Sequence, residues 1–247
     1  AERVMHQLSE MQLTCIVKKV NVDITDGLEA SARKARYQAI EEVVQQENAV
    51  AVFLGHTKDD QAETVLLGLA RGSGTRSLSG IAEVNGIYIR PFLVVTRETT
   101  ESVCQENEIE PWRDPHNDDP QFARVRVRKN ILPLMEKELG PGISEALART
   151  SRILREDADA LDEWAQEYSL RADALDIENL KALPKAVRAR VLRSAIYAAG
   201  APSGTLTFDH LEPVEALVTA WSGQGATSLP GGVKVERISG RLSLLKQ

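Results

Sequence analysis

Residues 49–64 read AVAVFLGHTKDDQAET, and this stretch decides the fold class. The apolar run at 49–55 is typical of a short strand buried in a parallel sheet. The segment that follows, 59–72, has a helical composition and ends at Gly72. A strand that passes directly into a helix predicts an α/β layer, and open α/β sheets place their ligands beyond the carboxyl ends of such strands.

Helices and strands alternate around this stretch. Apolar spacing predicts further helices at 1–12, 26–47 and 97–109, and further strands at 14–22 and 86–95. Residues 72–86 are expected to form a loop. Its GSGTRSLSG matches neither glycine-rich phosphate motif and follows a helix, so we do not interpret it as a phosphate loop.

The pattern changes near residue 130, where we predict a domain boundary. Residues 1–130 are expected to form the α/β domain with parallel strands and flanking helices. Residues 131–247 are expected to form a small, mainly helical domain that ends in a β-hairpin. Its predicted elements are helices at 143–170, 183–200 and 207–221 and a hairpin at 228–245.

Composition limits the classes of protein to which the chain can belong. Hydrophobic residues make up 43% of its 247 residues, and no apolar run approaches the ~20 residues that span a bilayer. Cys15 and Cys104 lie far apart without a CxxC pair, which excludes a disulfide framework and a four-cysteine zinc site. We therefore predict a cytoplasmic protein without membrane contact. Its net charge of −6 means that any nucleic-acid contact must use local basic patches.

The acidic cluster after the strand has two interpretations. Thr57 and Asp60 have the spacing of a capping box, and acids in a first turn suit the helix dipole. One helix start does not need three acids and a histidine, however. Such a cluster also suits a cation, either a metal with nucleotide phosphates or an ammonium group. The residues of this candidate site are His56, Asp59, Asp60 and Glu63.

Basic residues gather in two other places. Arg33 and Arg36 are three residues apart in a predicted helix, and Arg90 stands before Pro91 at a strand end. Each could be a solvated surface residue or part of a clamp on phosphate. The densest basic patch contains no acid and consists of Arg124, Arg126, Arg128 and Lys129. A polyanion would be expected to bind there first.

Several stretches, in order, resemble one family. GHTKDDQAETVLLGLARGSGTRSLSGI closely resembles the signature of tRNA(Ile)-lysidine synthetases. SARKARY resembles the family's AR-x-x-RY helix, and IRPFL its RPLL element. DPHNDDPQFARVRVRKNILPLME is similar to its DPSN…RNxxR…LLPxLE segment, and the tail resembles its small helical domain. The resemblance covers nearly the whole chain.

The resemblance implies a fold and an activity. The fold is a Rossmann-like domain of the adenine nucleotide alpha hydrolase type. The activity is a carbon–nitrogen ligation: ATP adenylates the wobble cytidine of the CAU anticodon of tRNA(Ile), lysine's amine attacks the same carbon, and AMP leaves. The product, lysidine, changes the codon and amino-acid specificity from Met to Ile. ATP, Mg²⁺, L-lysine and tRNA(Ile) are the implied ligands, with a homodimer as one subunit arrangement.

The resemblance also implies roles for individual residues. Asp60 and Glu63 match the acids that bind lysine, and His56 and Asp59 would line the same pocket. Phosphate of ATP or tRNA would be held by Arg33, Arg36 and Arg90. Contacts to tRNA would come from Asn117, Arg124, Arg126, Arg128 and Lys129. Two positions depart from the pattern, because Val125 replaces an Asn and His116 replaces a Ser. No metal ligand can be assigned.

One family element is missing from the sequence. The SGGxDS loop that holds the pyrophosphate of ATP does not occur, and we expect it upstream of Ala1. We therefore expect the chain alone not to make lysidine. Two alternatives stay open. A tRNA thiolase would generally need more cysteines than Cys15 and Cys104, and a non-catalytic tRNA-binding module would bind without turnover.

Overall fold

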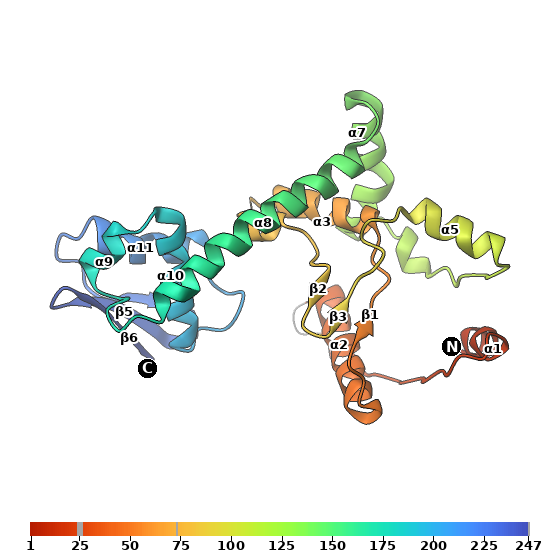
Figure 1. Ribbon diagram of the computed structural model, residues 1–247, viewed down its shortest axis with the longest axis horizontal. Coiled ribbons are helices and arrows are strands. Elements are labelled where there is room, and N and C mark those ends of the chain that lie inside the picture. The colour runs from red at the N-terminus through yellow and green to blue at the C-terminus, as the bar shows by residue number, and fades with distance from the viewer. Residues whose placement is uncertain (24–26, 73, 247) are drawn as a thin grey trace. The chain divides into compact units, whose positions relative to one another are not determined.

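The structure, a computed structural model, describes residues 1–23, 27–72 and 74–246 (Figure 1). By its internal packing the chain divides into two compact units, Ala1–Leu154 and Arg155–Gln247. The division falls inside helix α8 (Ile143–Ser169), whereas the predicted domain boundary lies near residue 130. That boundary stays a prediction.

Unit 1 is built around a small sheet with strand order β1-β3-β2. Strands β1 (Val52–Phe53) and β3 (Tyr88–Ile89) are parallel, and β2 (Val84–Asn85) joins β3 in antiparallel orientation. Helix α2 (Leu28–Glu47) precedes β1, and α3 (Lys58–Ala70) connects it toward β3. The parallel pair with an intervening helix confirms the predicted α/β class.

Helix α3 is the organising element of unit 1. Its first turn is closed by the predicted capping box between Thr57 and Asp60. Its buried face carries Ala62 and Val65, which are 0% and 4% exposed. The side-chain amide of Gln61 makes two hydrogen bonds to the backbone of Ile81: it accepts from Ile81 N at 2.6 Å and donates to Ile81 O at 3.0 Å. The loop after α3 is thereby fixed to the helix.

Short helices complete unit 1. The loop predicted at 72–86 contains one helix and one strand, and the basic patch lies on α6, which continues through a π-helical turn, η2. The elements are α1 (Glu2–Glu10), α4 (Thr75–Leu78), α5 (Arg97–Glu106), η1 (Pro115–Asp118), α6 (Ala123–Arg126), η2 (Val127–Ile131) and α7 (Leu132–Leu139).

Three strand predictions were wrong in extent. The strand predicted at 49–55 is confined to Val52–Phe53, and Phe53 is 69% exposed instead of buried. Residues 14–22 form no strand, and Ile16 and Val17 are exposed. In the described part of the chain no strand pairs with this segment, and an isolated strand is not stable in water. The strand predicted at 86–95 is confined to Tyr88–Ile89, because Pro91 has no N–H for a ladder and the chain turns there.

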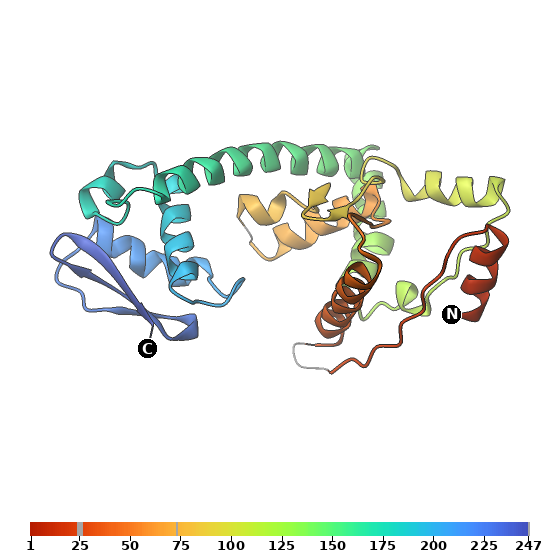
Figure 2. The same cartoon turned by 60° about the horizontal axis from the view of Figure 1, so that its bottom comes forward.

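Unit 2 contains one continuous hydrophobic core. Its helices and its antiparallel sheet can be followed in Figure 2. Its core includes Leu180, Ile196, Val214 and Val233, each 0% exposed. The predicted closing hairpin is confirmed and gains a third strand. The elements are α9 (Ile177–Ala182), α10 (Lys185–Ala198), α11 (Phe208–Thr219), β4 (Thr227–Leu229), η3 (Pro230–Gly232), β5 (Val233–Ile238) and β6 (Arg241–Lys246).

The turn between β5 and β6 requires residues that can adopt positive φ angles. Ser239 and Gly240 connect β5 to β6 with φ of 48° and 80°. Two successive positive φ values match the right-handed twist of a tight hairpin, and glycine adopts them without steric cost. Among the residues that the structure describes, no helix is both long and apolar enough to cross a bilayer.

Candidate functional site

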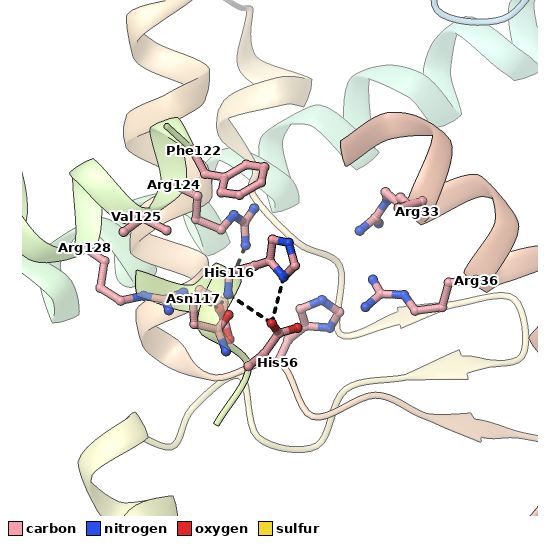
Figure 3. A pocket seen from close by; sticks show the side chains of 12 residues that line it. Arg33, Arg36, His56, His116, Asn117, Phe122, Arg124, Val125 and Arg128 are labelled. Carbon is pink, nitrogen blue, oxygen red and sulfur yellow. Dashed lines mark hydrogen bonds and ion pairs between the residues drawn. The ribbon is translucent and has the colours of Figure 1, made fainter. Parts of the chain in front are cut away.

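Unit 1 contains a cavity of about 570 Å³, a volume within the range of small-molecule sites. Four segments distant in sequence line it: α2, the turn from β1 into α3, the η1 turn, and α6 with its continuation (Figure 3). The lining residues predicted from sequence are Arg33, Arg36, His56, Asp60, Asn117, Arg124 and Arg128. Most of the predicted site residues therefore meet at one place.

The α2 wall carries guanidinium groups available to an anion. Arg33 lies over the ring of Tyr37, 4.8 Å from its centroid, and donates to the Tyr37 hydroxyl at 3.3 Å. Tyr37 in turn packs edge-on against Tyr88 of β3. Within the described residues neither Arg33 nor Arg36 is paired with a carboxylate. Both face the opposite wall across the cavity (Figure 3).

Asp60 uses its two oxygens differently. Its Oδ2 accepts from Thr57 N at 2.8 Å and from Thr57 Oγ1 at 3.0 Å, which completes the cap of α3. Its Oδ1 lies 3.1 Å from the guanidinium of Arg97. The capping and the charge-binding interpretations of this residue therefore both apply, each to its own oxygen.

Glu63 lies beneath the cavity wall and is 0% exposed. Arg128 holds it in a bidentate ion pair, with Nε to Oε1 at 2.6 Å and NH2 to Oε2 at 3.0 Å. Burial is the largest single effect and disfavours the charged guanidinium, but the hydrogen bonds to Glu63 and the negative charges of Glu63, Asp60 and Asp59 together outweigh it and raise the pKa of Arg128. A buried carboxylate is stable only when paired in this way.

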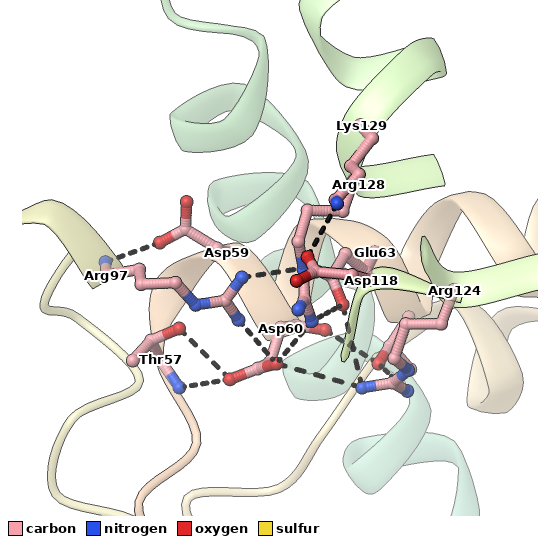
Figure 4. A network of polar contacts seen from close by, with 10 residues as sticks. Thr57, Asp59, Asp60, Glu63, Arg97, Asp118, Arg124, Arg128 and Lys129 are labelled. Atoms are coloured by element: carbon pink, nitrogen blue, oxygen red, sulfur yellow. Dashed lines mark hydrogen bonds and ion pairs between the residues drawn. The ribbon is translucent and has the colours of Figure 1, made fainter. Parts of the chain in front are cut away.

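Arg124 completes what we call the arginine–carboxylate network, formed by Asp60, Glu63, Arg97, Arg124 and Arg128 (Figure 4). Its guanidinium is 3.9 Å from Asp60 and 3.8 Å from Glu63, longer than a hydrogen bond. Its guanidinium donates a hydrogen bond to Thr64 Oγ1 at 3.2 Å. Arg124 is thus the loosest member of the network.

The network adds contacts that the sequence did not indicate. The carboxylates of Asp60 and Glu63 are paired with arginine side chains. Arg97, at the start of α5, was missed: its backbone N–H donates to Asp59 at 2.7 Å and its side chain reaches Asp60. A signal did exist, because an arginine in the first turn of a helix opposes the helix dipole and so needs an acidic partner.

His56 lies half-buried at the cavity, and its buried Nδ1 has no hydrogen-bond partner among the residues that the structure describes. Burial is the main cause that lowers its pKa, opposed by the charge of Asp60 and reinforced by Arg90, Arg33 and Arg124. The imidazole is therefore neutral at neutral pH. A neutral imidazole can accept a proton or a hydrogen bond.

The η1 wall was only partly foreseen. Asp114 accepts from the backbone N of His116 at 3.0 Å and from its Nδ1 at 2.9 Å, and these bonds lower the pKa of Asp114. The His116 ring packs edge-on against Phe122, with centroids 6.1 Å apart. Asn117 follows in the same turn. This wall offers an aromatic surface and an amide opposite the arginines of α2.

Five predicted site residues do not line the cavity: the buried Glu63, described above, and four others. Arg90 is 5% exposed and donates to Ala82 O at 2.8 Å. Asp59 accepts a hydrogen bond from the backbone N–H of Arg97, the first residue of α5. Arg126 donates to the carbonyls of Pro120 and Gln121, and Lys129 pairs with Asp118 at 2.6 Å. These placements leave their predicted ligand roles as predictions.

Metal binding has no preformed site in the described residues, since no three His, Cys, Asp or Glu side chains gather to hold an ion. The carboxylates of α3 are already paired with arginines. The protein side chains therefore do not by themselves fit a Mg²⁺ cage.

Two family profiles match the chain. The PP-loop domain matches residues 1–135, and the TilS substrate binding domain matches residues 175–243. The first match contains the whole cavity, and the second lies within unit 2.

Curated relatives match over almost the full chain. A tRNA(Ile)-lysidine synthase of Streptomyces coelicolor is 51% identical over 98% of this chain and 71% of its own length. One of Thermobifida fusca is 51% identical over 90% of this chain and 70% of its length. Among solved structures, the U34-tRNA thiolase NcsA from Methanococcus maripaludis, with its [4Fe-4S] cluster, aligns over 62% of this chain and 55% of that chain, with a TM-score of 0.49 and 16% identity. That likeness is too weak to carry an argument.

Proposed function

This chain belongs to the tRNA(Ile)-lysidine synthase family, and from that premise we propose that it ligates L-lysine to the wobble cytidine of the CAU anticodon of tRNA(Ile) at the expense of ATP. One observation carries the assignment of this chemistry to the unit 1 cavity. One cavity joins the guanidiniums of Arg33 and Arg36, which have no carboxylate partner among the described residues, to the carboxylate of Asp60. The reaction needs such a pair of surfaces, one for phosphate and one for an ammonium group.

The phosphate-bearing substrates would bind the arginine walls. Arg33 and Arg36 approach from α2 and Arg124 from α6, so phosphate oxygens between them could be contacted from both sides. Guanidinium groups bind phosphate through two parallel hydrogen bonds, which orients it as well as attracting it. Mg²⁺ would enter with the nucleotide, held by phosphate oxygens and water with at most one or two carboxylates.

Lysine would be bound by Asp60. Its Oδ1 faces the cavity-lining arginines, whereas Glu63 is fully buried and held on both oxygens by Arg128. Asp60 would therefore contact the ammonium directly, and Glu63 would support it by fixing Arg128. The two acids would therefore have different roles, whereas the sequence suggested that both bind lysine directly.

His56 would handle the proton of the nucleophile. A lysine ammonium has no lone pair, so it must lose a proton before its nitrogen can attack the activated cytidine carbon. The lowered pKa of His56 keeps its imidazole neutral and able to accept that proton beside Asp60. As the carbon–nitrogen bond forms, the bond from that carbon to the adenylated oxygen breaks and AMP leaves.

The tRNA would be gripped outside the cavity as well as inside it. Arg126 and Lys129 lie on the same continuous helical segment as Arg124 and Arg128. The guanidinium of Arg126 adds positive charge beside the cavity, whereas the ammonium of Lys129 would have to leave Asp118 to contact the tRNA. Asn117 lines the cavity from η1 and could bind the base or the ribose. A homodimer stays a prediction.

The decisive assay measures incorporation of labelled lysine into tRNA(Ile) by the full-length protein, with and without ATP. We expect incorporation that requires ATP and the CAU anticodon. A parallel assay for sulfur incorporation tests the thiolase alternative, and a gel-shift without turnover would favour a binding module. The proposal would be overturned if no lysine were incorporated either with or without ATP.

A further inference from the structure

The carboxylates that would bind lysine are already occupied. Asp60 and Glu63 are neighbours on α3, and three guanidiniums from Arg97, Arg124 and Arg128 surround them. A lysine ammonium that reaches Asp60 therefore meets other cations within ion-pair distance of the same oxygen. Like charges at such distances repel, so the site as it stands disfavours the substrate it is proposed to bind.

The three arginines are not equally fixed. Arg128 makes two short bonds to a fully buried carboxylate, and Arg97 is anchored through both its backbone N and its side chain. Arg124 is 3.8 Å or more from either acid, its side chain is 34% exposed, and it lines the cavity. Arg124 is consequently the member that can leave at the lowest cost.

A competing partner for Arg124 would sit in the same cavity. Arg33 and Arg36, which lack a carboxylate partner in the described chain, lie on the opposite wall. An anion drawn in by these two guanidiniums would lie between them and Arg124. A phosphate offers Arg124 shorter, bidentate hydrogen bonds than it has with Asp60 or Glu63.

We propose that Arg124 exchanges partners, from the carboxylates of Asp60 and Glu63 to the phosphate of an incoming substrate, and that this exchange opens Asp60 to lysine. Phosphate binding and lysine binding are then positively coupled, and lysine binds productively after the phosphate-bearing substrate. The inference rests on the proposed lysine site. By linkage, lysine must strengthen phosphate binding by the same factor.

The test measures the Kd of L-lysine for the full-length protein by calorimetry, alone and with saturating tripolyphosphate, a non-hydrolysable ATP analogue, or tRNA(Ile). In the wild type we expect each effective anion to tighten lysine binding by about fivefold or more, the usual range of allosteric coupling. The tripolyphosphate and analogue arms report on nucleotide phosphate, and the tRNA arm reports on backbone phosphate.

Arg124→Gln gives the sharper outcome. Without any anion, this variant should bind lysine about fivefold more tightly than the wild type, and added anion should no longer tighten it. A residue with only a tRNA-binding or structural role would leave lysine affinity unchanged or reduce it. Arg124→Lys keeps the charge without the planar fork and should retain weak coupling.

Arg149→Gln is the matched control, because it removes the same charge from an exposed position on α8 and should behave as the wild type. Equal lysine Kd values for the wild type with and without every anion would overturn the exchange. So would a variant Arg124→Gln that still responds to anion as the wild type does. If lysine binds under no condition, the proposed lysine site itself fails, which is a different result.

Discussion

Asp60 shows how one residue can serve structure and chemistry at once. Its Oδ2 caps α3 and its Oδ1 faces charged groups. Asp60→Asn keeps an oxygen for the cap but removes the charge. We expect the KM for lysine to rise roughly tenfold to a hundredfold, since a hydrogen bond to a charged group contributes about 1.5–3 kcal/mol.

Labelled-lysine incorporation at varied lysine concentration checks this expectation. Asp157→Asn, at an exposed position on α8, removes the same charge away from the site and should leave KM unchanged. An unaltered KM in Asp60→Asn would show that lysine binds elsewhere.

His56 makes a prediction about pH. Burial lowers its pKa in the folded protein, so the unfolded chain, with a histidine pKa of about 6.5, binds a proton more readily. The contribution of His56 to stability is present above about pH 6.5 and is lost as the pH falls through the lowered value in the folded state. His56→Gln does not titrate and should show a smaller loss of stability on acidification.

Urea unfolding at a series of pH values from about 7.5 to about 5 measures this difference, because carboxylates elsewhere contribute equally to both proteins. The same slope of unfolding free energy against pH in both would contradict the assignment.

The sequence predicted which residues line the site better than it predicted which side chains pair with one another. Arg33, Arg36, His56, Asp60 and Arg124 were all identified from pattern and family resemblance, and all line one cavity. The pairing of Glu63 with Arg128 joins residues 65 apart in the chain, and no local pattern reports such a contact. Arg33 and Arg90 looked alike in the sequence, yet only the second is buried.

At the scale of elements, one ion pair ties η2 to α3. Glu63 is 0% exposed and its partner Arg128 sits in the π-helical turn. Arg128→Met removes both hydrogen bonds from the buried carboxylate and leaves it only the longer contacts to Arg97 and Arg124, so it should lower the free energy of unfolding by roughly 3 kcal/mol. The double variant Arg128→Met with Glu63→Leu should recover most of the loss, because no unpaired charge remains.

Urea denaturation of the two variants and the wild type distinguishes these cases. If the single variant were as stable as the wild type, the pair would not be the anchor that its burial indicates.

The loop after α3 is held by a second device. Gly80 has φ of +62°, and a Cβ there would lie 2.5 Å from Gln61 Oε1, whose amide binds Ile81. Gly80→Ala should therefore destabilise the protein by about 1–3 kcal/mol through backbone strain and a disturbed Gln61. Gly74→Ala is the matched control, since its φ is −73° and a Cβ there meets nothing within 4 Å.

Thermal unfolding followed by circular dichroism compares the two glycine variants. Equal melting temperatures would show that the Gln61 contact does not fix this loop.

The element scale also shows where sequence patterns fail. In segment 49–64 the order of strand, cap and helix was predicted correctly, because the strand has a partner and the cap is local. The predicted burial of that strand was wrong, since Val50 is 90% and Phe53 69% exposed. Residues 14–22 have the same β-rich composition but form no strand, since β structure depends on a neighbour that composition does not encode. Hairpin β5–β6 was predictable because its turn is contained in the local sequence.

At the scale of the whole molecule, the two units have separate interiors. Leu180 is 0% exposed within the core of unit 2, whereas Leu170 is 84% exposed in the same unit. Leu180→Ala should cost about 2–5 kcal/mol through lost burial and the cavity left behind, and Leu170→Ala should cost little. Fluorescence of Trp164 and Trp221 during urea unfolding reports on this unit. Similar losses in both variants would contradict the assigned core.

Arg33 and Arg36 on α2 are exposed, whereas Glu63 under the opposite wall is fully buried. These two groups of charges should respond differently to ionic strength. Mobile ions screen surface charges over about 8–10 Å near physiological salt but hardly reach groups excluded from water. Added salt should therefore weaken the affinity of this protein for a polyanion while it leaves the stability of the fold almost unchanged.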